Sequence, residues 1–143
     1  MTIILDIQSA SSSEDTPDEQ SIRRCVGAVM NSKMGNTELS VRIVDEDEAK
    51  LLNETYRGAK GPTNVLSFPF ENETPEPLPL IGDIVVCAPV VAREAQQQNK
   101  DLSAHWAHMI IHGVLHLLGY DHLKLHEYKK MLNGEQKIFK SVK

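Results

Sequence analysis

Five of the six histidines in this 143-residue chain lie between His105 and His122. His112 and His116 are four residues apart in an apolar segment that reads as a helix, so both imidazoles would lie on one face. Gly119 can end that helix and turn the chain back, which would bring His122 to the other two. Three histidine nitrogens with an open fourth position are typical of a catalytic zinc site. The spacing therefore predicts one zinc ion per chain on these three histidines.

The remaining histidines are not expected to be ligands. His108 and His105 come one and two turns before His112 on nearly the same face, and His126 comes four residues after His122. We expect His105 and His108 to be neighbours of the ligands or surface groups.

The same spacing occurs in the zinc peptidase motif H-E-x-x-H-x-x-G-x-x-H, in which the Glu after the first His is the general base. Gly113 occupies that position here. A peptidase would therefore have to recruit another carboxylate, from Glu94, Asp121 or Glu127. A bound dication can polarise a phosphoryl oxygen without a carboxylate, which favours a phosphodiester substrate.

A second segment, residues 56–69, supplies positive charge before an expected strand. An arginine can hold phosphate oxygens with two donors at once, so Arg57 is the candidate for stabilising charge that develops on a phosphate. Lys60 would help to position the RNA backbone. The predicted catalytic residues are Arg57 and His112, and the predicted substrate-binding residues are Arg57 and Lys60.

Together the two segments resemble the YbeY family of bacterial rRNA maturation factors. The resemblance rests on His112-Gly-x-Leu-His-Leu-x-Gly-Tyr-Asp-His122 and on Tyr56-Arg-x5-Thr-Asn-Val-Leu-Ser-Phe-Pro69. Gly82-Asp-Ile84 and Met131-x3-Glu135 also fit the family pattern.

The resemblance implies a metal-dependent endoribonuclease that acts on single strands. It implies a role in 3′-end maturation of small-subunit (16S) rRNA and in ribosome quality control, with zinc on the three histidines and a functional Arg57. The expected partners are the rRNA precursor and the ribosome or ribosomal proteins.

Two departures from the family pattern stand out. Asn64 occupies a position where the family commonly has Asp, and the often acidic stretch after His122 reads Leu-Lys-Leu-His-Glu-Tyr-Lys-Lys here. Two alternative functions stay open at this point: a zinc peptidase with an atypical base, and a non-catalytic ribosome-associated binding factor.

The elements that would position these residues follow from the apolar periodicity. Strands are predicted at 3–7, 39–43, 65–68 and 83–87, and the last two are expected to form a hairpin with a long connection over 71–79. Helices are predicted from Pro17, with Thr16 as N-cap, and at 45–53, 89–98, 103–118 and 127–139. The order βαβαββααα predicts a single α+β domain, residues 1–143, in which helices cover a small mixed sheet of about four strands.

Composition limits the function classes further. The net charge of −5 argues against a protein that coats nucleic acid through bulk charge. Residues 93–143 nevertheless hold 8 Lys+Arg and 5 Asp+Glu, so the histidine-rich end is mildly basic. Cys25 and Cys87 read as buried thiols in a reducing compartment. With no signal peptide or membrane-spanning run in the sequence, we expect a cytoplasmic protein.

Overall fold

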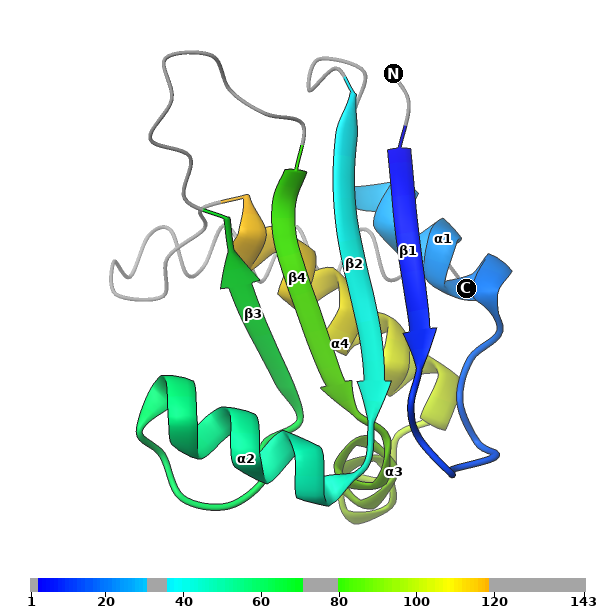
Figure 1. Ribbon diagram of the computed structural model, residues 1–143. Coiled ribbons are helices and arrows are strands. Elements are labelled where there is room, and N and C mark those ends of the chain that lie inside the picture. Colours follow the sequence, from blue (N-terminus) through cyan, green and yellow to red (C-terminus); the bar gives the residue numbers. More distant parts are fainter. Residues whose placement is uncertain (1–2, 31–35, 71–79, 119–143) are drawn as a thin grey trace, which may run out of the picture.

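Four strands form one mixed sheet in the computed structural model, which describes residues 3–30, 36–70 and 80–118. The strands are β1 (Ile3–Ser9), β2 (Thr37–Val44), β3 (Val65–Pro69) and β4 (Leu80–Cys87). Their order in the sheet is β1-β2-β4-β3 (Figure 1). β1, β2 and β4 run parallel, and β3 pairs antiparallel with β4 as an edge strand. The predicted hairpin is therefore confirmed, and its connection over 71–79 lies outside the described residues.

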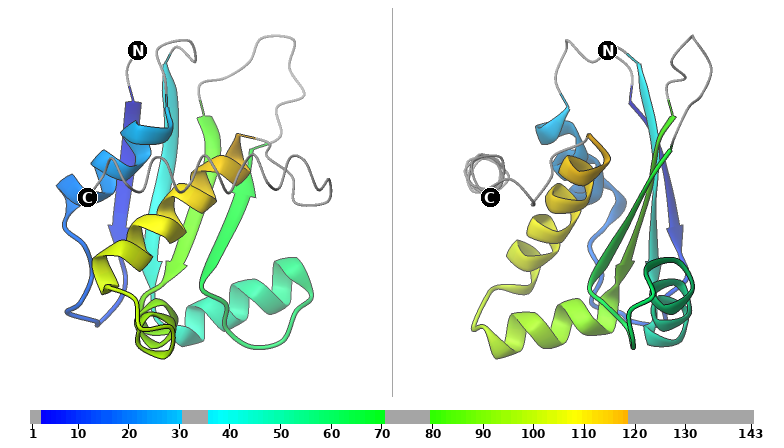
Figure 2. Two further views of the ribbon diagram at one scale, coloured as in Figure 1. Left: turned by 180° about the vertical axis from the view of Figure 1, so that it is seen from behind. Right: turned by 90° about the vertical axis from the view of Figure 1, so that its left-hand side faces the viewer.

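Four helices accompany the sheet: α1 (Glu19–Val29), α2 (Glu46–Arg57), α3 (Ala88–Gln97) and α4 (Leu102–Leu117). Figure 2 shows α1 and α4 covering one face of the sheet, α2 lying on the other face, and α3 crossing the end of the sheet. The predicted α+β class with a mixed four-stranded sheet is confirmed. The helix predicted at 127–139 lies outside the described residues. No helix in the described ranges is long and apolar enough to cross a membrane.

The start of α1 corrects one prediction. The N-cap is Asp18 and not Thr16, because the Asp18 carboxylate accepts a hydrogen bond from the Ser21 amide at 2.7 Å. This bond satisfies one of the orphan amides of the first turn and holds the pKa of Asp18 below its usual value. Pro17 therefore precedes the helix instead of lying in its first turn.

The second helix is longer than predicted. α2 runs past the expected end at residue 53 and finishes at Arg57, where Gly58 takes a left-handed conformation with φ of 66°. A glycine in that conformation ends a helix without steric cost. Arg57 is thus held on a helix terminus and not on a loop.

The main core lies between the sheet and the pair α1 and α4. It holds the apolar stripe of α1, which is Ile22, Cys25, Val26 and Val29. A smaller core lies on the other face under α2 and α3, and it includes Ala49, Leu66 and Val85. The face under α1 and α4 is therefore buried along the central strands. The other face is buried only where α2 packs on it, because Ser40 and Arg42 are half-buried and Asp83 is exposed.

Two glycines allow α4 to approach the sheet closely. A Cβ at Gly113 would lie 3.0 Å from Cγ2 of Ile84, which is fully buried. A Cβ at Gly82 would lie 2.7 Å from Leu117 Cδ2 and 2.4 Å from the Phe68 carbonyl oxygen, and the φ of Gly82 is 147°. At these two positions α4, β3 and β4 meet with no room for a side chain.

We expect Gly113→Ala and Gly27→Ala to change stability in opposite directions. Both replace a glycine in a helix, which favours the helix by about 1 kcal/mol. Gly27 has open space around its Cβ position, so that gain remains. At Gly113 the new methyl presses on Ile84, and overpacking of this kind costs about 1–3 kcal/mol.

Urea unfolding of the two variants measures the difference. Gly27→Ala should stabilise the protein by about 1 kcal/mol, and Gly113→Ala should destabilise it by a similar amount. Equal stabilisation by both variants would show that Ile84 yields and that the close approach is not needed.

Candidate active site

Histidines form the exposed stripe of α4. Over residues 104–117 every side chain of this helix is buried except His108, His112 and His116, which are half-buried. These three residues recur every four positions, so they follow one another along a single face. Because the other side chains of this stretch are buried, these histidines are the residues of 104–117 that are partly exposed in the described structure.

His112 and His116 point their Nε2 atoms toward each other. The two nitrogens are 2.9 Å apart, and the ring centroids are 4.5 Å apart. Two nitrogens bound to one tetrahedral zinc ion would be about 3.3 Å apart, so a small displacement would let both bind the same ion. The donor chemistry and the geometry of this pair therefore fit a metal site.

The third predicted ligand, His122, lies outside the described residues. Among the residues that the structure describes, no group of three or more His, Cys, Asp or Glu side chains is placed to hold a metal ion. The pair on α4 is thus the part of the predicted triad that the structure brings together.

His105 differs from the other histidines of α4 because it is buried, with 3% of its surface exposed. Its Nε2 lies 3.0 Å from Glu94 Oε1 on α3. The same carboxylate accepts from the Asn64 side chain at 3.0 and 3.2 Å, just before β3. Nδ1 of His105 has no hydrogen-bond partner among the described residues. Glu94 therefore ties the start of α4 to the start of β3, and His105 is a neighbour of the site and not a ligand.

Arg57 lies against the outer edge of β3. Its Nη2 donates to the main-chain carbonyl oxygen of Ser67, and its guanidinium carbon is 5.7 Å from the centre of the Phe68 ring. These contacts fix the plane of the guanidinium at a strand edge. They use one of its five N–H donors, so further donors are available for an anion.

Ser67 connects this arginine to the histidine pair. Its hydroxyl donates to the carbonyl oxygen of Gly113, the residue next to His112, at 3.3 Å. Ser67 thus connects the two groups. Arg57 binds its main-chain carbonyl, and its hydroxyl binds Gly113, which is adjacent to His112 on α4. Ser67 is not among the site residues predicted from the sequence, although a polar residue at an inward-facing position of a strand was a usable signal.

Lys60, the remaining predicted site residue, lies in the exposed loop between α2 and β3. In this loop Asn53 donates to the Gly61 carbonyl at 2.8 Å, and the Gly61 amide donates to Glu54 at 3.1 Å. These bonds anchor the loop to α2 close to Arg57. The structure shows no contact of Lys60 with the histidine pair.

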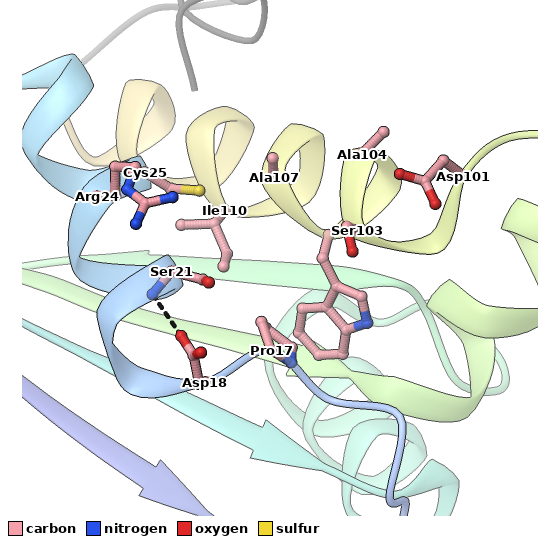
Figure 3. Close-up of a pocket in the computed structure, with 11 residues that line it drawn as sticks. Pro17, Asp18, Ser21, Arg24, Cys25, Asp101, Ser103, Ala104, Ala107 and Ile110 are labelled. Carbon is pink, nitrogen blue, oxygen red and sulfur yellow. Dashed lines mark hydrogen bonds between the residues drawn. The ribbon is translucent and has the colours of Figure 1, made fainter. Parts of the chain in front are cut away.

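A separate cavity of about 450 Å³ lies at the other end of α4. Figure 3 shows Asp18 and, on α1, Ser21 and Arg24 on one side of this cavity and Ser103, Ala107 and Ile110 of α4 on the other. None of the predicted site residues lines it. Cys25 also borders this cavity, and burial raises the pKa of its thiol, which makes it a weak nucleophile.

Comparisons with known proteins agree with the fold over most of the chain. A family model described as endoribonuclease YbeY matches residues 6–143. The chain is also similar to the solution structure of TM1509 from Thermotoga maritima, with a TM-score of 0.68 and 29% sequence identity. That similarity covers 95% of this chain and 88% of the other.

We expect Glu94→Ala to destabilise the protein by about 1–3 kcal/mol, because it leaves the buried His105 ring and the Asn64 amide without their shared acceptor. Arg93→Ala on the same helix is the matched control. It removes an exposed ion pair with Glu46, which contributes about 0–1 kcal/mol. Chemical denaturation of both variants tests this, and an equal effect would mean that the Glu94 network does not anchor α4.

Proposed function

The chain belongs to the YbeY endoribonuclease family, and on that premise we propose that it is a zinc-dependent endoribonuclease acting on single-stranded RNA. Its proposed task is 3′-end maturation of small-subunit (16S) rRNA and ribosome quality control, with the ribosome or its proteins as partners. The observation that carries the proposal is the half-buried pair His112 and His116, joined through Ser67 to Arg57.

His112, His116 and His122 are the proposed ligands of one zinc ion. The bound ion would supply a Lewis acid that polarises a phosphate oxygen. His112 thereby belongs both to the metal site and to the catalytic group.

Arg57 is the proposed anion clamp. Its position is set before substrate arrives, because the Ser67 carbonyl and the Phe68 ring already hold the guanidinium. A preorganised donor stabilises charge that develops on the phosphate without reorienting during the reaction. Lys60, on the neighbouring loop, is proposed to contact the RNA backbone farther along the strand.

The structure gives the zinc peptidase little support. Position 113, where a peptidase has its glutamate, faces Ile84 in the core, and a Cβ there would lie only 3.0 Å from Ile84 Cγ2. Of the other carboxylates considered, Glu94 is held by His105 and Asn64. Asp121 and Glu127 lie outside the described residues.

We propose further that residues 1–143 act as a single endoribonuclease domain in the cytoplasm. Support for this location comes from Cys25 and Cys87, which are both free thiols and both buried. Burial raises the pKa of each thiol, as expected of structural cysteines in a reducing compartment.

Metal analysis tests the ligand assignment. We expect about one zinc ion per chain in the purified protein and its loss in His116→Ala. His108→Ala, one helical turn before His112 on the same stripe, should keep its metal. Full metal content in His116→Ala, measured by mass spectrometry of the element, would refute the assignment.

An RNA cleavage assay tests the activity. We expect Arg57→Ala to lower kcat about 10²–10³-fold on a single-stranded RNA while leaving metal content unchanged. Arg93→Ala serves as the control for removal of an exposed arginine. A chelator should stop cleavage by the unaltered protein. Uncut RNA under all conditions, with binding retained, would favour the non-catalytic binding factor.

The product ends identify the nucleophile. Water and the RNA 2′-hydroxyl are both compatible with the residues of this site. A 2′,3′-cyclic phosphate on the product would exclude direct attack by water, whereas a linear phosphate formed without a cyclic precursor would support it.

A further inference from the structure

An open groove of about 460 Å³ lies on the face of the sheet opposite α4. This is the face turned toward the viewer in Figure 1, where α2 lies at the lower ends of the strands. Side chains of the strands and of α2 line it, and those that matter here are Ser40, Arg42, Glu48, Tyr56, Phe68 and Asp83. The proposed function does not use this groove.

The charges in the groove are unsuited to a phosphate. Arg42 is occupied by Glu48, with N–O distances of 2.5 and 2.9 Å, and by the side chain of Gln8 at 3.0 Å. The hydrogen bonds from Arg42 hold the pKa of Glu48 below its usual value, so this carboxylate stays charged at neutral pH. With Asp83 as a second carboxylate, the lining carries two negative groups and one positive group. A neutral molecule with hydrogen-bond donors suits it better than an anion.

One wall of the groove is aromatic. Tyr56 has 66% of its surface exposed, and its ring meets the Phe68 ring edge to face at 5.6 Å. The guanidinium of Arg57, the proposed anion clamp, also lies over the Phe68 ring. Exposed aromatic rings beside a phosphate contact are the arrangement by which proteins stack the bases of single strands.

Asp83 is placed to read the edge of a bound base. Its Oδ1 accepts from the Ser40 hydroxyl at 2.6 Å, which orients the carboxylate. A carboxylate has about four acceptor positions, so Asp83 can take further hydrogen bonds. Carboxylates accept from the exocyclic amino group of cytosine, whereas uracil presents an oxygen at the same position.

We propose that this groove binds one unpaired base of the RNA, stacked on Tyr56 and read by Asp83, and that it prefers cytosine to uracil. The proposal rests on the proposed function, because it takes RNA as the substrate. The phosphate next to the bound base would then reach Arg57, since Tyr56 and Arg57 are consecutive and both contact Phe68.

Fluorescence anisotropy with the full chain tests the proposal. The probes are a labelled cytidine 12-mer and a labelled uridine 12-mer, kept cold and checked on a denaturing gel to be intact. We expect cytidine to bind about tenfold more tightly than uridine. Tyr56→Ala should weaken cytidine binding about tenfold, and Tyr56→Phe should not. Asp83→Asn should abolish the preference for cytidine.

Leu51→Ala is the matched control, because Leu51 is 63% exposed on the same helix but does not line the groove. Its binding should be unchanged. Equal binding of both probes, or Tyr56→Ala binding like the unaltered chain, would overturn the proposal, and the second result would favour a protein partner on this face.

Cleavage of the same probes separates this proposal from the proposed function. A preference for cytidine without cleavage by any variant would support the proposed base-binding groove and refute the proposed endoribonuclease activity. If the Tyr56 and Asp83 variants cleave RNA as well as the unaltered chain and both probes bind with equal affinity, the proposed activity is supported and the base-binding groove is refuted.

Discussion

The close packing of α4 on the sheet determines where every group of the candidate site lies. Gly113 rests on Ile84, and Gly82 leaves room for Leu117, so the helix sits close to β3 and β4. At this distance all side chains of residues 104–117 are buried except three histidines. A larger residue at either glycine would lift the helix, and the histidines would move away from the edge strand that carries the other half of the site.

β3 transmits this placement to Arg57. An edge strand has one unpaired side of backbone, and Arg57 uses it by donating to the Ser67 carbonyl. The Ser67 hydroxyl donates on the other side of the sheet, to the Gly113 carbonyl on α4. A single residue therefore sets the relation between a cation from one face of the sheet and a histidine pair from the other. At the start of β3, the contacts of Glu94 with His105 and Asn64 likewise fix the position of α4 relative to this strand.

The periodicity of the sequence was sufficient to predict the four strands and the described helices, and the closeness of the last two strands in the sequence predicted the pairing of β3 with β4. The periodicity was insufficient to predict where the helices begin and end, because local hydrogen bonds and backbone conformation decide this. Asp18 is the N-cap instead of Thr16 because its carboxylate reaches the Ser21 amide. α2 continues to Arg57, where Gly58 takes the left-handed conformation that ends the helix. Spacing indicated that His112 and His116 share a face, since i and i+4 positions always do. Spacing carried no information on Ser67 or Phe68, because their roles depend on contacts between elements distant in the chain.

The charge of the chain fits a site that recognises RNA by contact. With a net charge of −5, long-range attraction contributes little to binding. The described positive groups near the site are few, and Arg57 is held in place by Ser67 and Phe68 before any anion arrives. The groove beyond it holds two carboxylates, which repel a phosphate and accept from a base. In the proposed binding mode, one phosphate lies at the edge of β3 and the backbone stays off the open face. Such a site would be specific for single-stranded RNA. An unpaired strand can turn a base away from its own phosphates, whereas the bases of a paired duplex cannot turn out in this way.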